Sequence, residues 1–153
     1  KGGFTGKKDY YVVQFGDVVL YRWLLRIGLT PNKSRTIGIL KVPDRYFFDF
    51  LRGHFDGDGS CFSYWDPRWK SSFMFYVTLC SASLAHIEWL QKTLYNLIHI
   101  KGHTCQDGRK ITWQLKYAKR ESKILIKRLY SKKNAPCLMR KYRKIRKILA
   151  TDK

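Results

Sequence analysis

The chain has few acidic residues, and this shortage limits the partners that it can have. It contains 11 Asp and Glu against 31 Lys and Arg, which gives a formal net charge of +20. A folded domain this basic repels itself and needs a polyanionic partner to offset that repulsion. Nucleic acid is the usual partner of such a domain.

Long apolar runs are also missing. No stretch approaches the roughly 18 apolar residues that a membrane-spanning helix needs, so no membrane partner is expected. No apolar stretch near the start resembles a signal peptide. The hydrophobic share of 44% and the aromatic share of 16% nevertheless exclude a disordered tail. A chain of 153 residues is long enough for one domain with a real core.

The closely spaced cysteine pairs of zinc ribbons do not occur here. The four cysteines lie far apart, at Cys61, Cys80, Cys105 and Cys137. His99, His103 and Cys105 are close in sequence but match no known ligand spacing, so we expect no metal there. Free thiols are typical of a reducing intracellular compartment, such as bacterial cytoplasm or an organelle.

The hydrophobic patterns predict an α+β unit over residues 41–153. A helix is expected from Asp44, which serves as its N-cap, and a helix over 84–98 is expected to be capped by Ser83. The expected strands are 60–65, 73–80, 99–105 and 111–117, and two more helices cover about 121–131 and 137–149. The order from Asp44 is α-β-β-α-β-β-α, with a four-stranded antiparallel sheet.

Residues 1–40 are expected to be the tail of a preceding repeat. A strand over 9–15, a helix over 17–28 and a Lys-bearing loop follow one another there. The same succession recurs over 111–130 and the basic stretch beyond it.

The segment LRGHFDGDG, residues 51–59, carries the candidate chemistry. Gly53 and Gly57 lie four apart on one helix face, and each costs about 1 kcal/mol relative to alanine. Close approach of another helix would explain both glycines. Asp56 and Asp58 stand at the helix C-terminus, where the macrodipole disfavours carboxylates. A bound Mg²⁺ or Mn²⁺ would reverse that penalty. A simple helix-terminating turn is the alternative.

FLRGHFDGDGS resembles the signature of the LAGLIDADG homing endonucleases. The αββαββα order is similar to the repeat of that family, and NAPCLMRKY resembles its C-terminal basic motif. The likeness covers residues 44–149, with a partial preceding copy over 9–40. It implies the LAGLIDADG fold and a saddle-shaped sheet that lies on DNA.

The resemblance also implies roles for residues of the motif. Asp58 would be the catalytic acid and a metal ligand, and the Gly57 carbonyl a second ligand. Asp56 would belong with Gly53 and Gly57 to the helix interface. The family cuts with one acid from each of two copies, but this chain has one such motif. Either two chains pair as a homodimer, or an upstream repeat supplies the second acid.

Two lysines match the basic residue that lies near the scissile phosphate in the family. Lys141 would stabilise the charge on the phosphate or activate the attacking water. Lys33 would be its equivalent in the partial copy. The alternative for Lys141 is one more charge on a basic helix.

Strand alternation predicts which side chains face DNA. The expected set on the sheet and its loops is Ser63, Trp65, Arg68, Lys70, Thr78, Ser81, Gln106, Arg109, Lys110, Thr112, Gln114 and Lys116. The basic face of the last helix, including Arg140, would contact phosphates.

The sequence thus predicts a metal-dependent endonuclease that cuts double-stranded DNA at specific sites. The alternative is a non-catalytic nucleic-acid-binding protein, either an intron RNA maturase or a DNA-binding regulator. An intein is not supported, because no splicing residues flank the motif. A structural ribonucleoprotein component would explain the charge but not the glycines.

Overall fold

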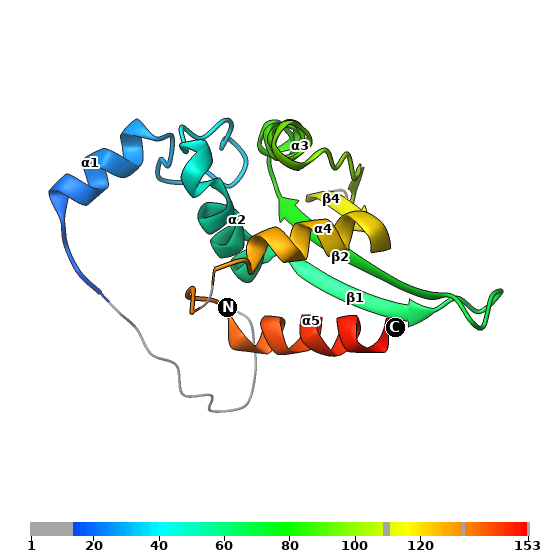
Figure 1. The fold of residues 1–153 in the computed structure, drawn as a ribbon. Coiled ribbons are helices and arrows are strands. Elements are labelled where there is room, and N and C mark those ends of the chain that lie inside the picture. Colours follow the sequence, from blue (N-terminus) through cyan, green and yellow to red (C-terminus); the bar gives the residue numbers. More distant parts are fainter. Residues whose placement is uncertain (1–13, 109–110, 133, 153) are drawn as a thin grey trace, which may run out of the picture.

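The computed structural model describes residues 14–108, 111–132 and 134–152, which form five helices and one sheet (Figure 1). The helices are α1 (Val18–Arg26), α2 (Asp44–Asp58), α3 (Leu84–Ile98), α4 (Lys119–Leu129) and α5 (Met139–Thr151). The strands are β1 (Ser60–Trp65), β2 (Phe73–Ser81), β3 (His103–Gln106) and β4 (Trp113–Ala118). The predicted α+β class and element order are confirmed, including the two helices that follow the last strand.

The sheet is antiparallel and open, with the strand order β1-β2-β4-β3. The two hairpins therefore meet through β2 and β4, where Thr78 lies opposite Lys116 and Leu79 opposite Leu115. Residues directly opposite one another in such a pair point to the same face of the sheet. The register thus fixes which side chains face the helices and which face the other way.

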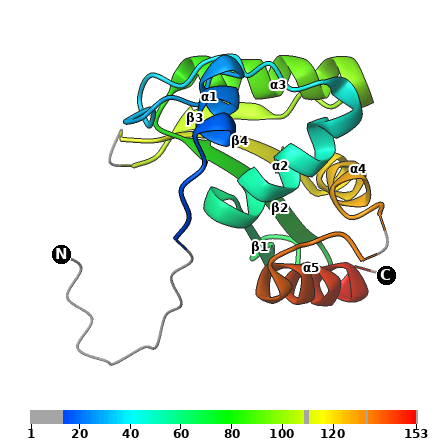
Figure 2. The same ribbon diagram turned by 90° about the vertical axis from the view of Figure 1, so that its left-hand side faces the viewer.

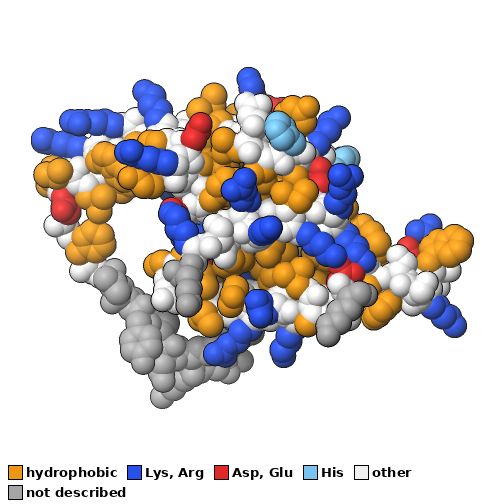
Figure 3. All heavy atoms as spheres, in the orientation of Figure 1, with side chains coloured by type: hydrophobic (Ala, Val, Ile, Leu, Met, Phe, Trp, Pro, Cys, Tyr) orange, Lys and Arg blue, Asp and Glu red, His pale blue; other side chains and the backbone are white. Residues whose placement is uncertain are grey.

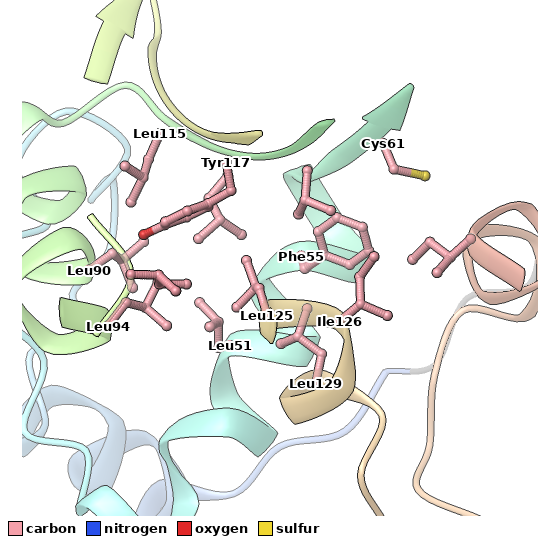
Figure 4. Close-up of a cluster of buried hydrophobic side chains, with 14 of the residues drawn as sticks. Leu51, Phe55, Cys61, Leu90, Leu94, Leu115, Tyr117, Leu125, Ile126 and Leu129 are labelled. Atoms are coloured by element: carbon pink, nitrogen blue, oxygen red, sulfur yellow. The ribbon is translucent and has the colours of Figure 1, made fainter. Parts of the chain in front are cut away.

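Helices α2, α3 and α4 cover one face of the sheet and enclose the core (Figures 1 and 2). Leu115 and Tyr117 point from the sheet toward Leu90, Leu94 and Leu51 of the helices (Figure 4). All five side chains are fully buried. Burying side chains of this size contributes roughly 1.5–3 kcal/mol each. No helix of the described residues covers the opposite face of the sheet.

Helix α5 runs beside the edge strand β1 (Figure 1). Its Ile145 and Ile148 join the core from one side of the helix, as the i, i+3 spacing requires. Its C-terminal end is fastened to α4, because Asp152 forms ion pairs with Lys119 and, at 2.7 Å, with Lys123. The Lys and Arg side chains on the outer side of α5 are exposed, and Figure 3 shows blue Lys and Arg side chains along the region of this helix.

The segment before α2 is anchored to α3, although α1 itself contains no buried residue. The Ser83 hydroxyl donates to the Ile37 carbonyl at 2.5 Å, and His86 Nδ1 lies 2.9 Å from the Gly38 carbonyl. The expected strand over 9–15 falls mostly outside the described residues, and its last two, Gln14 and Phe15, are not in a strand.

The two expected helix caps differ in detail from the structure. Pro43 occupies the N-cap position of α2, so the prediction that Asp44 is the cap is wrong; Asp44 begins the helix. Its carboxylate still lies at the end where the macrodipole favours negative charge. Ser83 does occupy the N-cap position of α3, but its side chain makes no capping bond, because the hydroxyl is engaged by Ile37.

Within the described ranges, none of the helices is long and apolar enough to cross a membrane. The four cysteines, all among the described residues, form no disulfide bond.

Candidate metal and nucleic-acid site

Helix α2 presents two different faces. Phe47, Leu51 and Phe55 follow one another at four-residue spacing and are buried against the sheet. On another side, Gly53 and Gly57 are exposed, and a Cβ added at either would meet no heavy atom within 4 Å. The two glycines therefore form an open strip, and no neighbour in the described chain accounts for them.

The end of α2 requires a glycine for a steric reason. A Cβ on Gly59 would lie 2.7 Å from the Phe55 carbonyl oxygen, which is far too close. The Gly59 amide donates to that same carbonyl at 2.9 Å and ends the helix. The chain then enters β1 directly, so Asp58 stands at the junction between the helix and the sheet.

Asp58 is exposed, and its carboxylate forms no hydrogen bond or ion pair with any residue of the described ranges. It lies at the negative end of the helix macrodipole, where a carboxylate is unfavourable. A carboxylate left free at such a position is suited to bind a cation.

Lys141 reaches across from α5 to the end of α2. Its Nζ donates to the carbonyls of Phe55 at 2.6 Å and Gly59 at 2.5 Å, and lies 3.4 Å from the Gly57 carbonyl. The last carbonyls of a helix lack donors from its own backbone, and a lysine side chain can supply one. Here Lys141 shares the Phe55 carbonyl with the Gly59 amide. Burial is the main cause that lowers the pKa of Lys141, followed by the nearby Arg140. Lys141 therefore caps α2, a role that the sequence analysis did not anticipate.

The Asp56 side chain is engaged by other parts of the chain. Its carboxylate accepts from the Leu138 amide at 2.8 Å and from the Tyr130 hydroxyl at 3.4 Å. It thereby ties α2 to the connection between α4 and α5. This contact within one chain gives Asp56 a structural task different from the helix-interface role that the resemblance implies.

A cavity of 690 Å³ lies next to Asp58, between α2, α3 and the segment before α2. It is lined by Asp58 and Lys33, together with His54, Cys80 and His86. The structure thus brings Lys33 to the same cavity as the candidate acid. Burial, and then the neighbouring His86, lower the pKa of His54 to about 4. Burial also lowers the pKa of His86.

The two histidines were not singled out from the sequence. Their rings lie 5.4 Å apart, and both His54 Nδ1 and His86 Nε2 are buried with no hydrogen-bond partner among the described residues. The one available signal is the position of His54 inside the segment 51–59. Because its partner His86 comes from α3, only the tertiary structure reveals the pair.

A second, smaller hollow of 320 Å³ adjoins the end of α2 on the side of α5. It is lined by Gly57, Gly59, Ser60, Cys61, Arg140, Lys141 and Lys144. Lys144 donates to the Cys61 carbonyl, and Arg140 is exposed beside it. Phosphate groups suit such a cationic hollow.

Part of the expected DNA-facing set lies on the wrong face. Ser63, Trp65 and Ser81 are opposite Phe75, Phe73 and Trp113, which belong to the helix-covered side, and Gln106 is also opposite Trp113. The prediction for these four residues is wrong. An error of one position along a strand moves a side chain to the other face of the sheet.

The remaining expected contacts are on the open side or in the loops. Thr78, Gln114 and Lys116 face away from the helices, although Thr78 is itself buried. Arg68 and Lys70 are exposed in the β1–β2 connection, where Arg68 pairs with Asp66 at 3.2 Å. Thr112 lines the cavity beside Asp58. Arg109 and Lys110 lie outside the described residues.

No three His, Cys, Asp or Glu side chains in the described ranges are placed to hold one metal ion. The donors available at the end of α2 are the Asp58 carboxylate and the Gly57 carbonyl. Both are hard oxygen ligands of the kind that Mg²⁺ prefers, and Mg²⁺ often combines one or two carboxylates with substrate phosphates and waters. The donor set therefore fits Mg²⁺ shared with a substrate.

Comparison of the chain with protein-family models found no match, and comparison with curated proteins found none.

Proposed function

We propose that the protein is a metal-dependent endonuclease of the homing type, with the LAGLIDADG fold, that cuts double-stranded DNA at specific sites. The observation that supports this best is the open strip of Gly53 and Gly57, which leads along α2 to the unpaired carboxylate of Asp58. Helix α2 thus carries a surface on which a second helix could pack, and the Asp58 carboxylate stands at the end of the same helix.

The strip supports pairing with a second helix. Two exposed glycines in one helix face cost stability, and a Cβ on either would meet no heavy atom of the described chain within 4 Å. A second α2, from another chain or from an upstream repeat, would approach closely along this strip and bring a second acid beside the first. The exposed apolar side chains of α1, such as Val19 and Trp23, also favour contact of α1 with a second copy or an upstream repeat.

Mg²⁺ or Mn²⁺ would be held by Asp58 and the Gly57 carbonyl of each copy. The ion would stabilise charge on the phosphate and lower the pKa of a bound water. Lys141, fixed at the end of α2 by the carbonyls of Phe55 and Gly59, would add positive charge close by. Lys33 would approach from the cavity side.

The open sheet would lie on the duplex, since it is the only face of the sheet in the described chain that helices leave free. Gln114 and Lys116 extend from β4 on this face. Arg68 and Lys70 extend from the β1–β2 connection, which projects beyond the helices (Figure 1). A chain charge of +20 supplies the general attraction to phosphate.

The test is Asp58→Asn, measured for cutting and for binding of a duplex selected from a random library. Cutting in Mg²⁺ should fall about a thousandfold, because a metal-stabilised charge is worth several kcal/mol. Binding in Ca²⁺ should change little. Asp44→Asn is the matched control, because it removes the same charge from the exposed opposite end of α2. An Asp58→Asn protein that still cuts would refute the assignment.

A second candidate function is non-catalytic binding of nucleic acid, either of intron RNA or of DNA as a regulator. The presence of one free motif carboxylate and the engagement of Lys141 by three carbonyls favour it. Preferential retention of a structured intron RNA over the selected duplex, with no cutting in Mg²⁺, would support this second function.

A further inference from the structure

The open side of β1 and β2 has an unusual composition for a surface that meets nucleic acid. The register assigns to it Ser60, Phe62, Tyr64, Met74, Tyr76, Thr78 and Cys80. None of these side chains carries a charge. The neighbouring β4 contributes Gln114 and Lys116 to the same face, so the polar and the apolar halves of the face are separate.

Three aromatic rings form a row within the apolar half. Phe62 stacks on Tyr76 with ring centroids 5.2 Å apart, and Tyr64 stacks on Tyr76 at 6.2 Å. Phe62 is 40% exposed and Tyr64 42% exposed. Apolar side chains gathered on one exposed surface indicate a binding site more often than isolated ones do.

Cations stand on both sides of this row. Lys116 lies beyond Thr78 across the sheet, and Arg68 and Lys70 lie in the connection at the far end of β1. Phosphates on either side of a groove would meet these cations, while the groove floor would meet the aromatic row. The chemistry of the row itself offers no charged donor to read a base by bidentate hydrogen bonds.

We propose that Phe62, Tyr64, Met74 and Tyr76 recognise the C5-methyl groups of thymine in the major groove of duplex DNA. The inference rests on the proposed function, which places this face on a duplex. Among the groups that bases present in the major groove, the thymine methyl is the apolar one, and aromatic side chains contact it favourably. The β1–β2 half of the sheet therefore selects thymine-rich steps, while Gln114 and Lys116 read their part by hydrogen bonds.

Stacking of unpaired bases on the same rings is the rival occupant. It needs free ring faces, because each base inserts against one of them. Phe62 and Tyr64 both stack on Tyr76, so the rings already occupy part of one another's faces. The row is thus better suited to contacts with methyl groups than to insertion of bases.

The test uses the wild-type protein and chemically altered DNA. A duplex is selected from a random library in Ca²⁺, and each thymine of the selected site is then replaced by deoxyuridine, which lacks the methyl group. Each methyl removed from contact with the row should raise the Kd about fourfold, and two or three together by more than tenfold. Thymines outside the contact should show no effect.

Variants assign the effect to the row. Phe62→Ser and Tyr64→Ser should bind the thymine and deoxyuridine duplexes equally well. Tyr95→Ser is the matched control, because Tyr95 is 54% exposed on α3 and lies on the opposite side of the molecule from the open face. It should retain the full preference for thymine.

The outcomes separate the two proposals. A selected duplex that binds equally with thymine or deoxyuridine overturns the methyl recognition and leaves the proposed function standing. Tighter binding of a single-stranded oligonucleotide than of the duplex assigns the row to base stacking and also overturns it. If no duplex is bound at all, the proposed function fails and the inference fails with it.

Discussion

Gly53 offers a substitution whose effects on stability and on association should have opposite signs. A Cβ at this position meets no atom within 4 Å in the described chain. Replacement by alanine in a helix interior removes a backbone-entropy cost of about 1 kcal/mol. Gly53→Ala should therefore raise the free energy of unfolding of the isolated chain by about 1 kcal/mol, or the Tm by about 2–4 °C.

Gly53→Leu extends the same reasoning to association. Leucine is nearly as good a helix former as alanine, so the isolated chain should again gain stability. Its side chain would fill the open strip and keep a second helix away, so association and cutting should both be lost. Urea denaturation measures the first effect, and sedimentation equilibrium with a cutting assay measures the second.

Gly59→Ala is the control for both measurements. Its Cβ would lie 2.7 Å from the Phe55 carbonyl oxygen, so the same substitution six residues further on should destabilise the chain. A loss of stability in Gly53→Ala would mean that something packs on the strip. Unchanged association in Gly53→Leu would show that the strip is not a helix interface.

Two further predictions concern groups that the fold buries. Lys141→Met should lower the free energy of unfolding by about 2–3 kcal/mol, because it removes a charged donor from the buried carbonyls of Phe55 and Gly59. Lys144→Met, which frees a single carbonyl, should cost less; equal losses in urea denaturation would contradict the capping role. For His54, the folded pKa of about 4 lies below the usual 6.5, so the unfolded chain binds the proton more tightly. Stability should fall as the pH drops from about 6.5 to 4, by at most about 3 kcal/mol. His54→Gln should remove most of this slope and leave the part due to His86, whose pKa burial also lowers, whereas exposed His103→Gln should leave the slope unchanged. A slope as steep in His54→Gln as in the wild type would show that another group causes it.

The helices and strands whose hydrophobic pattern fits a single type of secondary structure were predictable from the sequence. The helix over 84–98 was predicted with its observed bounds, because its leucines recur on one face. The four strands and their antiparallel arrangement follow from the β-branched and aromatic runs between turn residues. The second hairpin is shorter than expected, since its strands are His103–Gln106 and Trp113–Ala118.

The faces of β1 could not be assigned from the sequence, because apolar residues occupy both of them. Cys61 and Trp65 alternate with Phe62 and Tyr64, so hydrophobicity favours neither set. Only the pairing with β2, where Cys61 lies opposite Val77, decides which set faces the helices. The aromatic row on the open face was missed for this reason.

The position of the Lys141 side chain was equally inaccessible to sequence reasoning. The other basic residues of α5 are exposed, and nothing local in the sequence separates from them the lysine that becomes buried. That choice is made by the carbonyls of Phe55 and Gly59 at the end of α2, which lie more than 80 residues earlier in the chain.

The ammonium group at the end of α2 has a consequence for the order in which ligands bind. Lys141 Nζ lies 3.4 Å from the Gly57 carbonyl, so a metal ion approaching that oxygen meets a positive charge already in place. Repulsion at such short range weakens the affinity of the free protein for a divalent cation. A phosphate arriving between the two cations would convert that repulsion into shared attraction. We therefore expect the ion and the nucleic acid to bind cooperatively, with each raising the affinity for the other by the same factor.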